Sequence, residues 1–211
     1  MVNSEMSQMH EKLWDQLTNL NPQETAIRSQ CRYIKDRDSY LIRMLNKEYE
    51  VNLTNRRVAI AGTHSEPRVA GYLQQLCILV YLIHAQNLPL ANIFVKGTSF
   101  PGGLFFFRGL HSLPTDKLIK AFGTRPALLK EAIESLKAEE YSFGDASARI
   151  TVLPRIPLLF VTWGSNDEFD ASASILFDKT ASEHLPLDAL WAAVNLTVEE
   201  VMNGINKYQT N

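Results

Sequence analysis

The residues Pro157-Leu158-Leu159-Phe160-Val161-Thr162-Trp163 decide the fold class, because they form an almost wholly apolar run. Such a run is typical of a central strand in a sheet. A turn over 164–167 follows, and small polar side chains then alternate with apolar ones over 169–177. The sequence therefore predicts a hairpin of two strands in the middle of a sheet.

Further strands and several helices surround this hairpin in the sequence. Short strands bounded by turn residues are expected at 40–45, 49–53, 57–61, 93–95 and 148–153. Apolar spacing and capping residues predict helices at 4–19, 22–30, 63–86, 115–122, 125–137 and 185–207. We therefore expect a single α+β domain over residues 1–211, with a mixed, largely antiparallel sheet flanked by helices. The helix within residues 1–20 could lie at its periphery.

The composition is that of an ordinary soluble globular protein of 211 residues, 45% of them hydrophobic and 21% charged. The longest wholly apolar run, Leu76 to Ile83, has eight residues, far fewer than a membrane span needs. Residues 1–10 lack the pattern of a secretory signal, so we expect a cytoplasmic protein without a membrane partner. Cys31 and Cys77 are isolated and form no metal-binding CxxC pair.

The charges are unevenly distributed along the chain. The net charge of -2 argues against nucleic-acid binding, which depends on a broadly basic surface. Residues 1–159 carry 19 Lys and Arg against 15 Asp and Glu, whereas residues 160–211 carry 2 against 8. This asymmetry indicates either ordinary solvated faces or an acidic C-terminal surface that docks a basic partner or holds a cation.

The segment from Phe100 to His111 contains a glycine pair, Gly102 and Gly103, followed by three consecutive phenylalanines. Adjacent glycines allow the backbone to approach a neighbour closely. That neighbour is a cofactor, a substrate or another strand of the protein, and the sequence leaves these three alternatives open.

Acidic residues cluster in and after the turn of the predicted hairpin. Asp170 and Asp178 are eight residues apart, which separates them by roughly 26 Å along a strand, so they cannot share one ion. Asp167 and Glu168 remain as candidate ligands of a divalent cation or as an acid/base pair. The alternative is an ordinary solvated turn. The chain has no GxSxG, HExxH, CxxC or phosphate-loop motif that would indicate another catalytic class.

Several short segments together resemble a prokaryotic family of domains of unknown function, over about residues 22–193. They are Tyr81-Leu82, Phe100-Pro101-Gly102-Gly103, Leu153-Pro154-Arg155-Ile156-Pro157, Trp163 with Asp167-Glu168-Phe169, and Ile175-Leu176-Phe177-Asp178. The resemblance implies a family that is typical of anaerobic bacteria and archaea. In some members, this domain is fused to a four-cysteine iron-sulfur module like that of corrinoid iron-sulfur proteins. It brings no settled activity.

This chain departs from the family pattern at the hairpin turn. The family's turn resembles Asp-Glu-Glu-Phe-Pro-Ala, whereas this chain has Asn166 in place of the first acid and Asp170 in place of the proline. The iron-sulfur module is missing, so any electrons or iron would have to come from a separate protein.

Three hypotheses about function follow from the residues and the resemblance. In the first, a pocket holds a corrinoid or another planar tetrapyrrole; its residues are Gly102, Gly103, Phe105, Phe107 and Trp163, with His64 or His111 as axial ligand. The alternative is that these phenylalanines alternate between the core and a sheet face. In the second, Asp167 and Glu168 serve a metal-assisted enzyme. In the third, the domain docks a corrinoid or iron-sulfur protein through its acidic C-terminal surface. The leading expectation is a cytoplasmic accessory or binding protein of anaerobic corrinoid or redox metabolism.

Overall fold

Two antiparallel sheets make up the strand content of the protein, whose computed structural model describes residues 2–62 and 68–209. The first sheet has the order β1-β2-β3-β4, with bounds Arg32–Ile34, Ser39–Met44, Lys47–Asn52 and Arg57–Ile60. The second has the order β5-β9-β8-β7-β6, with β5 Phe94–Val95, β6 Glu139–Tyr141, β7 Ala146–Leu153, β8 Ile156–Trp163 and β9 Ser172–Asp178. The predicted α+β class is confirmed, but the strands form two sheets rather than one, and every described pairing is antiparallel.

The predicted central hairpin is present as β8 and β9. β8 is the middle strand of the second sheet and is buried from Ile156 to Thr162. It pairs with β9 from Leu158↔Phe177 to Trp163↔Ser172. Alternate residues of this hairpin, Leu158 and Phe160 among them, join the main hydrophobic core, and Leu159 and Val161 are buried outside it. The sheet therefore has a core face and a second, outer face.

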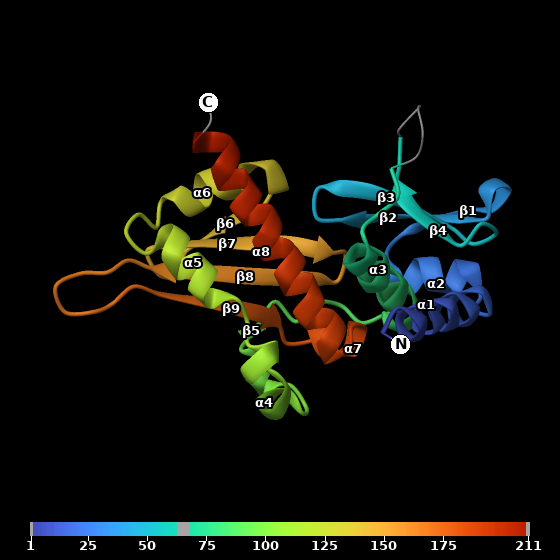
Figure 1. Cartoon of the computed structure of the whole chain (residues 1–211), viewed down its shortest axis with the longest axis horizontal. Helices are drawn as coiled ribbons and strands as arrows, with labels where there is room; N and C mark the ends of the chain where they lie inside the picture. Colours follow the sequence, from blue (N-terminus) through green and yellow to red (C-terminus); the bar gives the residue numbers. More distant parts are fainter. Residues whose placement is uncertain (1, 63–67, 210–211) are drawn as a thin grey trace.

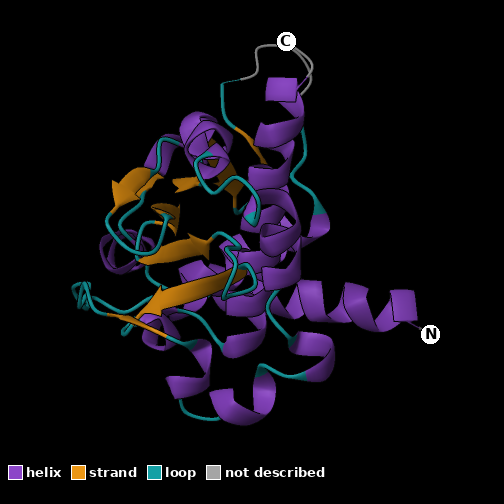
Figure 2. Ribbon diagram, turned by 90° about the vertical axis from the view of Figure 1, so that its left-hand side faces the viewer, coloured by secondary structure: helices purple, strands orange, loops and turns teal. Residues whose placement is uncertain are grey.

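Helices cover the core face of the second sheet (Figure 1). They are α5 Thr115–Phe122, α6 Leu128–Ile133 and α8 Leu187–Gln209. α5 packs on β8 and β9, and α6 packs on β7 and α8. Figure 2 shows α8, the long helix that ends at C, running along one side of the strands. The remaining helices are α1 Val2–Thr18, α2 Pro22–Ser29, α3 Tyr72–His84, α4 Gly103–Phe106 and α7 Ala181–His184.

The helix predicted over 63–86 begins later than expected, at Tyr72. The predicted cap at residues 63–66 lies outside the described residues. Just before the helix, the Ala70 N–H donates to the Val58 carbonyl at 2.9 Å, and Val69 bridges to Ala59. The chain therefore follows the edge of β4 before it turns into α3, and this pairing replaces the first helical turns. Gly71 caps the helix, and its N–H donates to the Gln74 side chain at 2.7 Å.

Polar contacts from buried side chains hold α2, α3 and the β7–β8 turn together. The Tyr81 hydroxyl donates to the Ser29 carbonyl at 3.0 Å and accepts from the Arg155 N–H at 3.2 Å. The Arg155 guanidinium is buried and donates to the carbonyls of Arg28 and Leu88, at 2.7 and 2.6 Å. Tyr81 and Arg155, which belong to the segments of the family resemblance, therefore stabilise the fold.

Candidate functional site

The glycine pair approaches the protein's own backbone. Gly102 has a φ of +73° and opens the short helix α4. A Cβ on Gly103 would lie 2.1 Å from the carbonyl oxygen of Gly97, so only glycine fits there. The sequence left a cofactor, a substrate or another part of the protein as the close neighbour of the glycine pair. In the structure this neighbour is the backbone at Gly97 of the same chain.

Phe105 and Phe106 lie on α4 and Phe107 is its C-cap, so the alternative that the phenylalanines alternate between the core and a sheet face is wrong. Phe105 is 76% exposed, with the Arg108 guanidinium 5.0 Å from its ring centroid. Phe107 instead packs against Phe177 of the core, with ring centroids 5.7 Å apart. Backbone hydrogen bonds between residues four apart make α4 a helix. One of them runs from the Phe107 N–H to the Gly103 carbonyl at 3.0 Å.

The structure separates the residues predicted to surround a tetrapyrrole. His111 is exposed, stacks on Phe106 at 4.5 Å and meets the edge of Trp191 at 5.5 Å. Trp163 lines a different hollow, on the outer face of the second sheet, which none of the other predicted ligand-binding residues that the structure describes lines. His64 lies outside the described residues.

The outer face of the second sheet carries an apolar hollow of about 560 Å³. Its floor is made by Leu159, Val161 and Leu176 of β8 and β9. Trp163 stands at the end of β8, and the other lining residues come from the strands and loops on either side and are Asn92, Ile93, Phe94, Tyr141 and Phe143. An aliphatic floor with aromatic walls suits an apolar ligand that stacks on the rings, and the volume lies within the usual range of small-molecule sites.

The aromatic walls support one another. The rings of Tyr141 and Phe143 stack 5.7 Å apart, with an angle of 21° between their planes. Phe94 meets Tyr141 edge to face at 5.8 Å. Phe143 and Ile93 are each more than half exposed, and Trp163 is 38% exposed. The hollow therefore presents aromatic surface to solvent from strands at both edges of the sheet.

Asp178 fixes the β5 side of this hollow. Its side chain is fully buried at the end of β9, and its two oxygens accept from the N–H groups of Ala91, Asn92 and Thr180 and from the Thr180 hydroxyl, at 2.7–3.1 Å. Burial alone would raise the pKa of this carboxyl, but the four hydrogen bonds outweigh it and lower the pKa below its usual value. Asp178 is thus a structural anion that positions Asn92, a residue with a φ of +54°.

Asp167 and Glu168 lie in the exposed loop between β8 and β9. The loop is organised by Asn166, whose side-chain oxygen accepts from the N–H groups of Glu168 and Phe169 at 2.9 and 2.8 Å. Within residues 2–62 and 68–209, no three His, Cys, Asp or Glu side chains gather as a group that could hold a metal. A metal-assisted enzyme that uses Asp167 and Glu168 therefore stays a prediction, and the described residues offer no third such ligand beside these two.

The acidic residues of the C-terminal third do not gather on one surface. Asp167, Glu168 and Asp170 precede β9, whereas Glu183 and Asp188 follow it, so the length of β9 separates the two groups. Figure 1 shows the β8–β9 loop and α7 at the two ends of this strand. An acidic docking surface would therefore be the β8–β9 loop alone or the α7–α8 region alone.

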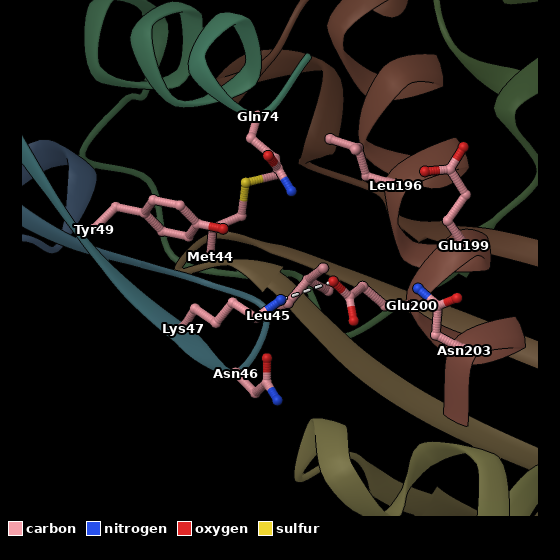
Figure 3. Close-up of a pocket in the computed structure, with 10 residues that line it drawn as sticks. All are labelled: Met44, Leu45, Asn46, Lys47, Tyr49, Gln74, Leu196, Glu199, Glu200 and Asn203. Carbon is pink, nitrogen blue, oxygen red and sulfur yellow. Dashed lines mark hydrogen bonds and ion pairs between the residues drawn. The ribbon is translucent and has the colours of Figure 1, made fainter. Parts of the chain in front are cut away.

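A second, polar cavity of about 200 Å³ lies where the β2–β3 turn meets α3 and α8 (Figure 3). Lys47 and Glu200 form an ion pair across it, with 2.9 Å between Nζ and Oε1. Burial and the nearby charge of Glu200 raise the pKa of the Tyr49 hydroxyl above its usual value. The cavity brings together residues from 44–49, position 74 and 196–203, a combination that no local sequence pattern predicts.

The family model that matches this chain describes a domain of unknown function, DUF3786, and it covers residues 21–200. The chain belongs to the DUF3786 family. The match agrees with the range of about 22–193 expected from the resemblance. Neither the curated proteins nor the solved structures include a significant match to the chain. In the described part of this DUF3786 protein, no helix has the length and apolar composition needed to cross a membrane.

Of the aromatic residues of the hollow, Trp163 alone was predicted from the sequence as part of a binding site. Tyr141 and Phe143 are two positions apart, which places side chains on the same face of an extended segment. That spacing was the available signal, but residues 139–141 are polar and exposed, and their pairing with β7 is what makes them a strand.

Proposed function

We propose that this DUF3786 protein is a binding protein and that its ligand is a planar, largely apolar molecule lying flat in the outer-face hollow. The observation that carries the proposal is the combination of an aliphatic floor with four aromatic side chains, Phe94, Tyr141, Phe143 and Trp163. Soluble proteins rarely leave such a surface uncovered without a partner or ligand. Stacking and burial of apolar surface would supply the affinity.

A tetrapyrrole is the ligand class to test first, since it is planar and mostly apolar. None of the nine described residues that line the hollow is a His, Cys, Asp, Glu or Met, so we propose that the ring is held by stacking and not by an axial side chain of this hollow. Arg149 is the cross-strand neighbour of Leu159 and shares its face of the sheet. It lies at the margin of the hollow, where it could face an acidic side group of the ligand, although it is already paired with Glu139 at 2.8 Å.

The cellular setting forms part of the same proposal. A role in corrinoid or redox metabolism of anaerobes, a cytoplasmic location, and docking of a corrinoid or iron-sulfur protein are all supported by the family resemblance alone. An accessory protein that holds or delivers a tetrapyrrole would need a binding surface but no catalytic motif, in keeping with the absence of catalytic signatures from the sequence.

Titration of the purified protein with haemin and with cobinamide tests the proposal, with visible absorption and tryptophan fluorescence as readouts. We expect saturable binding of at least one of them, weakened roughly tenfold or more by Trp163→Ala and by Phe143→Ala, because each removes a stacking partner. His111→Ala serves as the matched control, because His111 lies outside the hollow. The proposal fails if neither compound binds, or if His111→Ala abolishes binding while Trp163→Ala leaves it unchanged.

A further inference from the structure

The first half of β9 is a free sheet edge. β5 pairs with β9 at only two positions, Phe94↔Asp178 and Val95↔Phe177, and the chain then leaves the sheet in the 3-10 turn Gly97–Ser99. β9 continues in the other direction to Ser172 and pairs there with β8 alone. One side of residues 172–176 therefore has no neighbouring strand among the described residues.

The hydrogen-bond alternation of an antiparallel sheet shows which backbone groups face this edge. The Lys179 N–H donates to the Ile93 carbonyl at 2.8 Å, so the backbone of residue 179 points toward β5. Successive residues of a strand point their N–H and C=O groups to opposite sides. Phe177, Ile175 and Ala173 therefore point the same way as Lys179, whereas the residues between them bond to β8.

The N–H and C=O groups of Ala173 and Ile175 consequently face the open edge. Within residues 2–62 and 68–209, no hydrogen bond from another segment reaches them. Natural edge strands are usually protected by a charged residue, a proline or a bulge. The stretch Ser172-Ala173-Ser174-Ile175-Leu176 has no charge and no proline, and its pairing with β8 runs without a register shift. This edge has none of the usual protection against strand addition.

A groove of about 270 Å³ runs beside the edge. Its near side is formed by residues 173–176, and its far side includes Gly97, Phe107, Leu113 and Thr115. Phe107 and Leu113 give the far side apolar surface, while Lys96 adds a positive charge at the β5 end. The groove is thus bounded by a row of backbone donors and acceptors on one side and by side chains on the other.

We propose that an extended peptide segment of a partner protein adds to the second sheet as a strand beside β9. Ala173 and Ile175 would exchange backbone hydrogen bonds with it, as in other cases of strand addition. Alternate apolar side chains of the peptide would pack on Phe107 and Leu113.

Charged residues at the two ends of the groove indicate which end of the added segment is basic. Asp167, Glu168 and Asp170 lie in the exposed loop immediately before β9, and none of them forms an ion pair with the described residues. Lys96 lies at the opposite end of the groove. The partner segment is therefore basic where it passes the β8–β9 loop and neutral or acidic near Lys96.

Selection from a displayed library of random octapeptides on the purified protein tests this inference. We expect enriched sequences with apolar residues at alternate positions and Lys or Arg at one end. Ala173→Pro removes an outward N–H that the β8 ladder does not use, so the fold should persist while affinity for the selected peptides falls roughly tenfold or more. Ser172→Ala changes an exposed side chain of the same strand that does not line the groove and leaves the outward groups in place, so it should bind like the wild type.

Amide hydrogen exchange of the wild-type protein provides a readout that needs no variant. The Ala173 and Ile175 amides should exchange faster than those of Ser174 and Leu176, and a selected peptide should slow them. The inference is overturned if no sequence pattern is enriched, if Ala173→Pro binds the peptides like the wild type, or if the Ala173 and Ile175 amides are already protected without peptide. Trp163→Ala, which tests the outer-face hollow, should not alter peptide binding, so the two proposals fail independently.

Discussion

Replacing Asp178 tests whether this buried carboxylate organises the end of β9 and one wall of the hollow. It accepts four hydrogen bonds, from three backbone N–H groups and one hydroxyl, and it is fully buried. Hydrogen bonds to a charged group contribute about 1.5–3 kcal/mol each, but they share one carboxylate and are not additive. We therefore expect Asp178→Ala to lower the free energy of unfolding by about 4 kcal/mol.

Asp178→Asn should cost less, about 2 kcal/mol, because the amide retains one acceptor oxygen and its NH₂ group opposes the remaining donors. Urea unfolding followed by circular dichroism measures both variants, with Asp170→Asn in the exposed loop as the matched control expected to be neutral. A loss below about 1 kcal/mol for Asp178→Ala would refute the assigned role.

The lowered pKa of Asp178 adds a pH dependence with a definite sign. Because the folded-state pKa lies below the ordinary value of 3.8 for an aspartate, the unfolded state binds the proton more readily. This group's contribution is therefore fully present above the unfolded-state pKa and is lost as the pH falls through the folded-state pKa. Asp178→Asn should remove that part of the acid sensitivity, measured as unfolding midpoints between neutral pH and the acid transition.

Three further substitutions have separable expectations. Gly103→Ala would place a Cβ 2.1 Å from a carbonyl oxygen and should cost about 3 kcal/mol in urea unfolding, whereas Gly109→Ala meets no atom within 4 Å and should cost only the φ strain of about 1 kcal/mol. Tyr81→Phe leaves the Ser29 carbonyl without its donor and should cost about 2 kcal/mol, without affecting ligand or peptide binding. Burial, and to a lesser extent the charge of the nearby Arg155, lowers the pKa of His184 from 6.5 to about 4. The unfolded state therefore binds the proton more readily, and the free energy of unfolding should fall as the pH drops from 6.5 toward 4. Unfolding curves of His184→Gln should show a flatter pH dependence.

The elements that were predictable from the sequence are those specified by local patterns. The helix at 115–122 has its predicted bounds. Asn21 caps α2 through its side-chain oxygen, which accepts from the N–H groups of Gln23 and Glu24. The delayed start of α3 and the presence of β6 were not predictable, because both depend on pairing with a strand distant in the sequence. The residues 139–141 carry two glutamates and no buried side chain, so only the β7 ladder marks them as a strand.

The candidate site was less predictable than the fold, for the same physical reason. Trp163 could be recognised as an aromatic residue at the end of a central strand, but its partners Phe94 and Tyr141 come from strands at the two opposite edges of the sheet. The glycine pair correctly indicated a close backbone approach, but one-dimensional sequence does not identify the neighbour, which is Gly97.

β9 connects the core, the hollow and the free edge, and the geometry of a strand explains how one short segment can serve all three. Phe177 packs its ring into the core, while Leu176, one residue earlier, contributes to the floor of the hollow on the opposite face. The hydrogen-bonding groups of Ala173 point in a third direction, within the plane of the sheet. Leu176 lines both the hollow and the groove, whereas Trp163 of β8 lines only the hollow and Ala173 only the groove. Trp163→Ala and Ala173→Pro therefore act on different surfaces, and this pair of variants makes ligand binding and peptide binding separable in one small domain.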